Sequence, residues 1–144
     1  MAIEENKRVG IGHFEEVWNQ GKLELISTYY AADFSNFGKQ TPLERIRQIV
    51  EAWRTAFPDL HFSIDAQLAE GDRVLYHCTL AGTHLGPFVM PGLWNLAPTG
   101  RRFSVRQMHL IRVRDGQIAE HWAVRDDLGM LQQLGIVPAP VQTV

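Results

Sequence analysis

The segment from Gly116 to Gly135, GQIAEHWAVRDDLGMLQQLG, combines a strand pattern with a helix pattern at the end of the chain. Side chains of a strand alternate between two faces of its sheet. One face of this strand would carry Ile118, Glu120, Trp122, Val124 and Asp126. Its apolar members predict that this face is buried, so Glu120 and Asp126 are expected to point inward with them.

Inward carboxylates are unusual because burial is costly unless they are hydrogen-bonded, paired or protonated. The pattern therefore favours an internal cavity with a partly polar lining. Two simpler interpretations stay open. Glu120 could bond to backbone groups, and Asp126 or Asp127 could cap the N-terminus of the helix DLGMLQQL.

The preceding strand, RRFSVRQMHLIRV (residues 101–113), has the same mixed character. Gln107 and His109 share a face with Phe103, Val105, Ile111 and Val113, whereas Arg102, Ser104, Arg106 and Arg112 form a solvated or subunit-facing surface. The turn at Asp115-Gly116 predicts a hairpin with the last strand. Gln107 and His109 are then expected in one cavity wall with Glu120, Trp122 and Asp126. A lone inward histidine is more often a core residue, but this combination indicates a functional site.

The N-terminal half has helical periodicity. An amphipathic helix is predicted to end near Gly21, followed by a short helix over 23–30 and a strand over 32–37. The segment TPLE predicts a capping box with Thr41 as N-cap and Glu44 at the third helical position. The buried face of that helix would comprise Leu43, Ile46, Val50, Trp53 and Phe57.

From Leu60 onward the period changes to two, which predicts strands at about 60–69, 72–84, 101–114 and 117–126. Helices followed by a run of antiparallel strands indicate an α+β fold with the helices on one face of the sheet. The irregular segment 85–100, LGPFVMPGLWNLAPTG, is apolar for a loop. It is predicted to be either a lid over the cavity mouth or a contact with a second subunit.

Composition narrows the function. The 144 residues, 45% of them hydrophobic, predict a single domain over 1–136 with a loosely held tail at 137–144. A net charge of −2 without basic patches gives no support for nucleic-acid or membrane binding. The lone Cys78 and the absence of a signal-peptide pattern predict a cytoplasmic protein. Scattered histidines and missing glycine motifs predict neither a metal nor a cofactor.

The chain contains, in this order, the segments FEEVWNQGKLELISTYYAADFSNF, AFPDLHFSI, EGDRVLYHCTLAGTHLG, PTGRRF and DGQIAEHWAVRDDLGMLQQLG. Together they resemble the SnoaL-like polyketide cyclases, also called ester cyclases, of the nuclear transport factor 2-like superfamily. The resemblance implies a cone-shaped α+β barrel, with N-terminal helices packed on the concave face of a curved, mostly antiparallel sheet. It also implies a homodimer or higher homo-oligomer.

Cyclases of this family close a ring by an intramolecular aldol reaction without metal or cofactor. The resemblance assigns the acid/base role to the aspartate near the end of the last strand, which is Asp126 in EHWAVRD. A carboxylate in an apolar pocket can remove a proton alpha to a carbonyl. His109 is expected to be its electrophilic or orienting partner, with Gln107 and Glu120 as polar supports.

The predicted function is therefore acid/base cyclase or isomerase chemistry on a hydrophobic, carbonyl-bearing small molecule such as a polyketide. The predicted substrate-binding residues are Gln107, Glu120, Trp122, Trp18, Phe37, Trp53, Tyr76, His84, Phe88, Met90 and Trp94. Asn36-Phe37 replaces the Asn-His common in the family, and segment 85–100 is longer than usual, so the substrate shape should differ. The alternatives are a noncatalytic binding or stress-associated module, and a hydratase, hydroxylase or hydrolase in which Asp126 activates water.

Overall fold

The structure, a computed structural model, describes residues 2–139. Its helices are α1 (Ala2–Gly12), α2 (Ile26–Tyr29), α3 (Leu43–Ala56) and α4 (Asp127–Gln133), with a π-helical segment η1 (His13–Asn19) and a 3-10 turn η2 (Leu23–Leu25). Its strands are β1 (Tyr30–Asn36), β2 (Lys39–Gln40), β3 (His61–Glu70), β4 (Arg73–Thr83), β5 (Phe88–Met90), β6 (Trp94–Leu96), β7 (Arg102–Arg114) and β8 (Gln117–Arg125). None of these helices is both long and apolar enough to cross a membrane.

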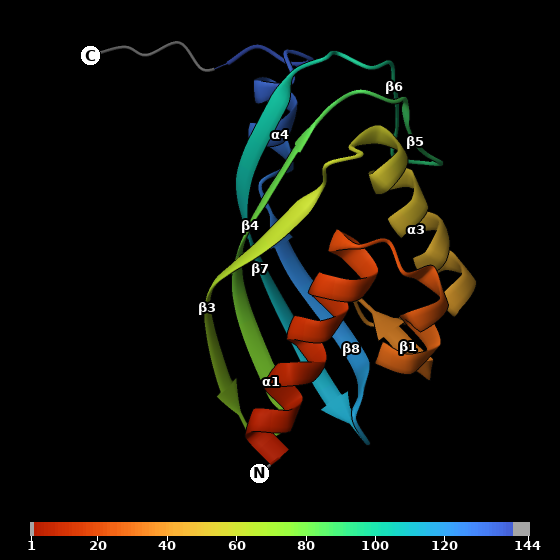
Figure 1. Cartoon of the computed structure of the whole chain (residues 1–144), viewed down its shortest axis with the longest axis vertical. Coiled ribbons are helices and arrows are strands. Elements are labelled where there is room, and N and C mark those ends of the chain that lie inside the picture. The colour runs from red at the N-terminus through yellow and green to blue at the C-terminus, as the bar shows by residue number, and fades with distance from the viewer. Residues whose placement is uncertain (1, 140–144) are drawn as a thin grey trace.

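The main sheet has the strand order β2-β1-β8-β7-β4-β3. Its neighbours pair antiparallel except for β1 and β8, which run parallel. Helix α1 lies across the sheet, and α3 lies beside β1 and the small β5–β6 sheet (Figure 1). The predicted α+β fold, with helices against a curved and mostly antiparallel sheet, is confirmed. Because β1 returns beside β8, the end of the first strand reaches the predicted site.

Two hairpins form the centre of the sheet: β3 pairs with β4, and β7 pairs with β8, as predicted from the Asp115-Gly116 turn. At the second turn Asp115 and Gly116 have φ values of 52° and 74°. Positive φ at both central residues matches the twist of the paired strands, which explains the Asp-Gly sequence. This tight turn fixes the register along β7 and β8.

The predicted first helix forms as α1 followed without a break by η1. Its buried side includes Gly10, His13, Phe14 and Val17. A Cβ at Gly10 would lie 2.0 Å from the Tyr76 hydroxyl, so only glycine allows this approach of α1 to β4. His13, the first residue of η1, is buried on this same face, and π-helical segments often occur at functional sites.

The buried face of α3 is as predicted, but its N-terminus is not. Ile46, Val50 and Trp53 are buried, and Leu43 is half-buried against the core. The helix begins at Leu43, and no side chain caps it. The Thr41 hydroxyl instead donates a hydrogen bond to the Lys39 carbonyl at 2.9 Å. The predicted capping box is therefore wrong, because the Thr41 hydroxyl bonds to Lys39 of β2 and not to the N-terminus of α3.

Segment 85–100 contains an unpredicted hairpin of β5 and β6. The Phe88 ring packs against Trp53 and Phe57, with ring centroids 4.7 and 5.3 Å apart. Phe88 and Met90 are thus part of the core, whereas Val89 and Leu93 are exposed. The subunit-contact interpretation stays a prediction for those exposed side chains. Of the predicted tail, residues 140–144 lie outside the described part of the chain.

One inserted residue in β8 decides which side chains face inward. Arg112 pairs with Glu120 and Val113 pairs with Ile118, so Ala119 is an extra residue in the ladder. Ile118 and Ala119 are both buried. A bulge of this kind exchanges the two faces of the strand beyond it. After Ala119 it is the odd-numbered residues that face the helices.

Candidate functional site

A pocket opens between the helices and the concave face of the sheet and has a volume of about 90 Å³. Most of its wall is aromatic or aliphatic, and its polar lining comes from β1, β7, β8 and η1. The lining residues are His13, Phe14, Trp18, Tyr30, Asn36, Phe37, Ile49, Trp53, Phe62, Leu80, Gln107, His109, His121, Ala123 and Arg125. Among the described residues this lining includes no carboxylate.

Four polar side chains of the pocket form one continuous hydrogen-bonded row. Asn36 Oδ1 lies 2.7 Å from His121 Nδ1, His121 Nε2 lies 2.8 Å from His109 Nδ1, and His109 Nε2 lies 2.8 Å from Gln107 Oε1. We call these four residues the Asn36–Gln107 row. The bulge at Ala119 makes the row possible, because it places His121 opposite Ile111, and Ala123 opposite His109, on the concave face.

Aromatic rings surround the two imidazoles. The rings of Phe14 and Phe62 meet His109 edge-on at centroid distances of 5.3 and 5.6 Å, and Phe37 meets His121 at 5.8 Å. Burial, followed by repulsion from neighbouring cationic groups, lowers the pKa of His121 to about 3 and that of His109 well below its usual value. Both imidazoles are therefore neutral at pH 7.

His13 is a third buried imidazole in the pocket. Its Nδ1 lies 2.7 Å from the Gly10 carbonyl oxygen, which can only accept, so Nδ1 carries the hydrogen and Nε2 the lone pair. Burial lowers the pKa of His13 to about 4, although the hydrogen bond to Gly10 opposes this shift.

Asp126 does not lie in this pocket. Its side chain is exposed and accepts a hydrogen bond from the Gly129 N–H at 2.8 Å, as the N-cap of α4. A Cβ at Gly129 would lie 2.3 Å from the carboxylate, so the glycine leaves room for the cap. The expected inward orientation of Asp126 is wrong, and the capping alternative is confirmed. Its catalytic role stays a prediction without a structural argument.

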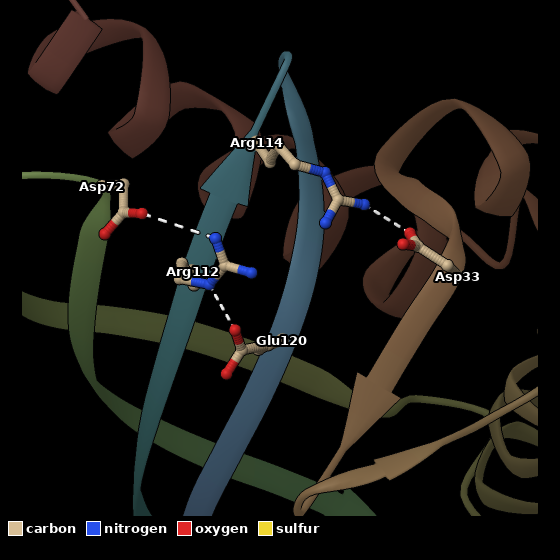
Figure 2. A network of polar contacts seen from close by, with 5 residues as sticks. All are labelled: Asp33, Asp72, Arg112, Arg114 and Glu120. Carbon is tan, nitrogen blue, oxygen red and sulfur yellow. Dashed lines mark hydrogen bonds and ion pairs between the residues drawn. The ribbon is translucent and has the colours of Figure 1, made fainter.

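Glu120 and Trp122 lie on the convex face, so their expected inward orientation is also wrong. Glu120 accepts a hydrogen bond from Arg112, which also contacts Asp72 at 3.6 Å, and Arg114 pairs with Asp33 nearby (Figure 2). Trp122 is 44% exposed and Val124 is 75% exposed. The bulge is the physical reason, since it turns every even-numbered residue after Ile118 outward.

The other predicted pocket residues divide into two groups. Gln107, His109, Trp18, Phe37 and Trp53 line the pocket. The remaining five residues, Tyr76, His84, Phe88, Met90 and Trp94, do not line it.

Those five residues have structural contacts instead. The Tyr76 hydroxyl donates to the Lys7 carbonyl at 2.7 Å beneath α1. His84 is fully buried against Phe57, with Nδ1 3.1 Å from the Thr99 hydroxyl. Phe88, Met90 and Trp94 belong to the β5–β6 hairpin, which packs on α3.

The sequence-based prediction missed five polar residues of the pocket: His13, Tyr30, Asn36, His121 and Arg125. Two successive small or apolar residues, Ile118 and Ala119, were the available signal for a bulge. The alternation of Ala119, His121, Ala123 and Arg125 gave no sign of burial, because small and polar residues also suit an exposed face. Within residues 2–139, no group of three or more His, Cys, Asp or Glu side chains is arranged to hold a metal ion.

Known proteins share this architecture. The family described as SnoaL-like polyketide cyclase matches residues 10–134. The chain is 34% identical over 128 residues to aklanonic acid methyl ester cyclase DnrD of Streptomyces peucetius, covering 83% of this chain and 84% of that protein. It is 32% identical over 124 residues to nogalonic acid methyl ester cyclase of Streptomyces nogalater, covering 82% and 89%.

A solved structure agrees with these sequence matches. TsrD from Streptomyces laurentii superposes with a TM-score of 0.81 at 26% identity, covering 93% of this chain and 97% of that one. The chain belongs to the SnoaL-like polyketide cyclase family. Its pocket offers neutral imidazoles, two amides and one guanidinium group, so it can exchange protons with a substrate and stabilise a developing oxyanion.

Proposed function

We propose that this protein is a cyclase that closes a ring by an intramolecular aldol reaction of a hydrophobic, carbonyl-bearing small molecule. One observation carries the proposal. A row of proton-accepting and proton-donating side chains lies along one wall of an otherwise aromatic pocket. The aromatic walls would hold the carbon skeleton, and the polar wall would act on its carbonyl groups. The family relatives that are ester cyclases support this assignment.

Arg125 supplies the positive charge of the pocket. Arg125 lines the pocket, and its guanidinium Nη2 is 3.0 Å from the Asp127 carboxylate. Deprotonation next to a carbonyl develops negative charge on oxygen, and a cation held nearby stabilises it. The partner Asp127 keeps the Arg125 side chain beside the strand while leaving it other N–H groups for the substrate.

The pocket volume limits how much of a substrate can be enclosed. About 90 Å³ is small beside the roughly 300–1,000 Å³ of common ligand pockets. The enclosed space therefore suits the reacting end of a substrate, with the rest lying across the mouth beside Phe37, which is 46% exposed. This favours a long or polycyclic substrate over a compact one that must be fully enclosed.

The test uses aklanonic acid methyl ester, the compound in the name of the first relative, and a small aryl β-keto ester. An aldol ring closure yields a product with the mass of the substrate but a different retention time and proton spectrum. We expect turnover of a polyketide ester that falls by about 10²–10⁴-fold in His109→Gln, because this variant interrupts the row of groups that exchange protons with the substrate.

Binding without turnover would contradict the proposal. If such esters raise the melting temperature while wild type and His109→Gln show the same background rate, the protein is a binding module. Asp126→Asn belongs in the same series, because asparagine also caps helices well. A turnover loss as large as that of His109→Gln would restore the acid/base role of Asp126.

A further inference from the structure

The Asn36–Gln107 row has one hydrogen too few when both imidazoles are neutral. It contains three short contacts, and both terminal amides turn an oxygen toward a ring nitrogen. Two neutral imidazoles carry only two N–H groups. One contact must therefore lack a hydrogen, or one amide must turn its NH₂ group inward. A third proton on the pair would complete all three contacts at once.

Burial determines which end of the row lacks the hydrogen. Gln107 is 2% exposed and His109 is 7% exposed, whereas Asn36 and His121 are only partly buried. An unsatisfied contact costs most where neither water nor a rotating amide can relieve it. The His109 Nε2–H group therefore donates to Gln107 Oε1, and the His121 Nε2–H group donates to His109 Nδ1. This leaves the lone pair of His121 on Nδ1, at the end beside Phe37 and the pocket mouth.

We propose that His121 Nδ1 is the group that takes the proton from the substrate, and that His109 and Gln107 are positioning residues that fix its tautomer. The inference rests on the proposed function and adds to it the identity of the base. A substrate oxygen or carbon that approaches Nδ1 displaces the Asn36 amide, which can rotate because it ends a partly exposed strand. The arrangement resembles a triad in logic, with an imidazole and an amide behind the base.

The proton balance closes within the pocket. The C–H bond alpha to a carbonyl breaks, its proton moves to His121 Nδ1, and its electron pair forms an enolate. The enolate carbon then bonds to the carbon of a second carbonyl, whose oxygen becomes an alkoxide. That alkoxide takes the proton back from Nδ1. Between the two transfers the positive charge is shared with His109 through the hydrogen bond at 2.8 Å.

The surroundings keep the resting pair uncharged. Burial of the two rings is the larger cause, and the Arg125 guanidinium from β8 repels a proton on either ring. His13 from η1 also faces the pair but is itself neutral at pH 7, because its pKa is about 4. Tyr30 from β1 also lines the pocket, and burial raises its pKa, so its hydroxyl stays neutral. The enolate formed in the first step reverses this balance, because a negative oxygen next to the pair stabilises the imidazolium ion. The pair is thus free to accept a proton at rest and charged only during the reaction.

His13 is the competing base, since its Nε2 lone pair also belongs to a pocket-lining ring. It has no second imidazole bonded to it that could share a proton. The experiment must therefore separate His13 from His121.

The first measurement is deuterium incorporation from D₂O into the carbon alpha to the ketone of an aryl β-keto ester, followed by NMR with and without protein. We expect His121→Gln to lower the catalysed exchange rate by about 10²–10⁴-fold with little change in KM. His77→Gln, on the other face of β4 and away from the pocket, is the matched control and should exchange like wild type. Loss in His13→Gln with retention in His121→Gln would overturn the assignment.

The second measurement reads the tautomers directly and needs no substrate. In protein labelled with ¹⁵N-histidine, we expect His109 and His121 at pH 7 to be neutral with hydrogen on Nε2, and to show a ¹⁵N–¹⁵N coupling across their hydrogen bond. Hydrogen on Nδ1 of His121, or a cationic ring, would overturn the inference even if the variants fail to fold. Catalysed exchange without ring closure of any ester would instead contradict only the proposed function.

Discussion

The concave and convex faces of the β7–β8 hairpin differ in the partners to which their polar side chains bond. On the concave face Gln107, His109 and His121 bond to one another among aromatic rings. On the convex face Arg112 pairs with Glu120 and Asp72 beside exposed apolar side chains such as Met108. The pairs of Arg112 thus lie on the face where water can solvate them. On the concave face the Asn36–Gln107 row is neutral, and the charged Arg125 lies at the end of β8 with Asp127 as its partner. One extra residue, Ala119, therefore determines which side chains of β8 face the pocket.

Two neighbours on β7 offer the strongest test of this difference, since Gln107 lies on the concave face and Met108 on the convex face. Gln107→Leu removes the acceptor for His109 Nε2–H and frees the tautomer of the pair. We expect kcat to fall by about 10²–10³-fold, the range for losing one preorganised hydrogen-bond partner. Met108→Leu should leave kcat unchanged, because its side chain is 43% exposed on the other face.

The conservative variant Gln107→Glu distinguishes a positioning role of Gln107 from a purely structural one. A carboxylate beside His109 would stabilise the protonated pair, so the acid limb of the pH profile of kcat/KM should move to higher pH. A purely structural role of Gln107 would lower kcat in both variants and leave the position of that limb unchanged. Steady-state kinetics at several pH values, with circular dichroism to verify folding, distinguish these outcomes.

The elements of the fold could be predicted from the sequence, whereas the site was predicted only in part. Strand periodicity and the Asp115-Gly116 turn determine the β7–β8 hairpin and place Gln107 and His109 inward. The bulge at Ala119 could not be predicted in this way. An extra residue in a strand is recognised only from its pairing with the neighbouring strand, which the periodicity of one strand does not contain. Periodicity continued through Ala119 therefore placed Glu120, Trp122 and Asp126 on the wrong face.

Other residues of the site were missed because their positions depend on contacts between distant segments of the chain. Asn36 reaches His121 because β1 and β8 run parallel, a pairing between segments about 85 residues apart that no local pattern specifies. His13, by contrast, lies on the same helical face as Gly10, Phe14 and Val17, so helical periodicity does place it inward. It was missed because a single inward histidine is more often a core residue than a functional one. The homo-oligomer implied by the family stays a prediction, and Trp122 and Val124 on the convex face are the exposed side chains to examine first.

Acid should destabilise the protein through its concave face. Burial lowers the pKa of His13 from 6.5 to about 4, so between these values the unfolded chain binds a proton that the folded chain does not. Stability is therefore fully present above pH 6.5 and decreases as the pH falls toward 4. His13 alone accounts for about 3 kcal/mol of this loss.

Urea unfolding between pH 7.5 and 4.5 measures this dependence. His13→Gln should be less stable at pH 7.5 but should lose less stability on acidification than wild type. If the free energy of unfolding decreased equally with falling pH in the two proteins, the folded protein would accommodate a protonated His13, contrary to the enclosed pocket described above.

The smallest expected effect concerns Glu120 on the convex face. In Glu120→Gln the Arg112 guanidinium keeps Asp72 within 3.6 Å, and both side chains of the lost pair are partly exposed. Such pairs contribute about 0–1 kcal/mol, so the urea midpoint should change little and the change should shrink in high salt. Turnover should equal that of wild type. A tenfold loss of turnover would place Glu120 in the pocket, which requires β8 to pair without the bulge at Ala119, and His121 would then leave the Asn36–Gln107 row.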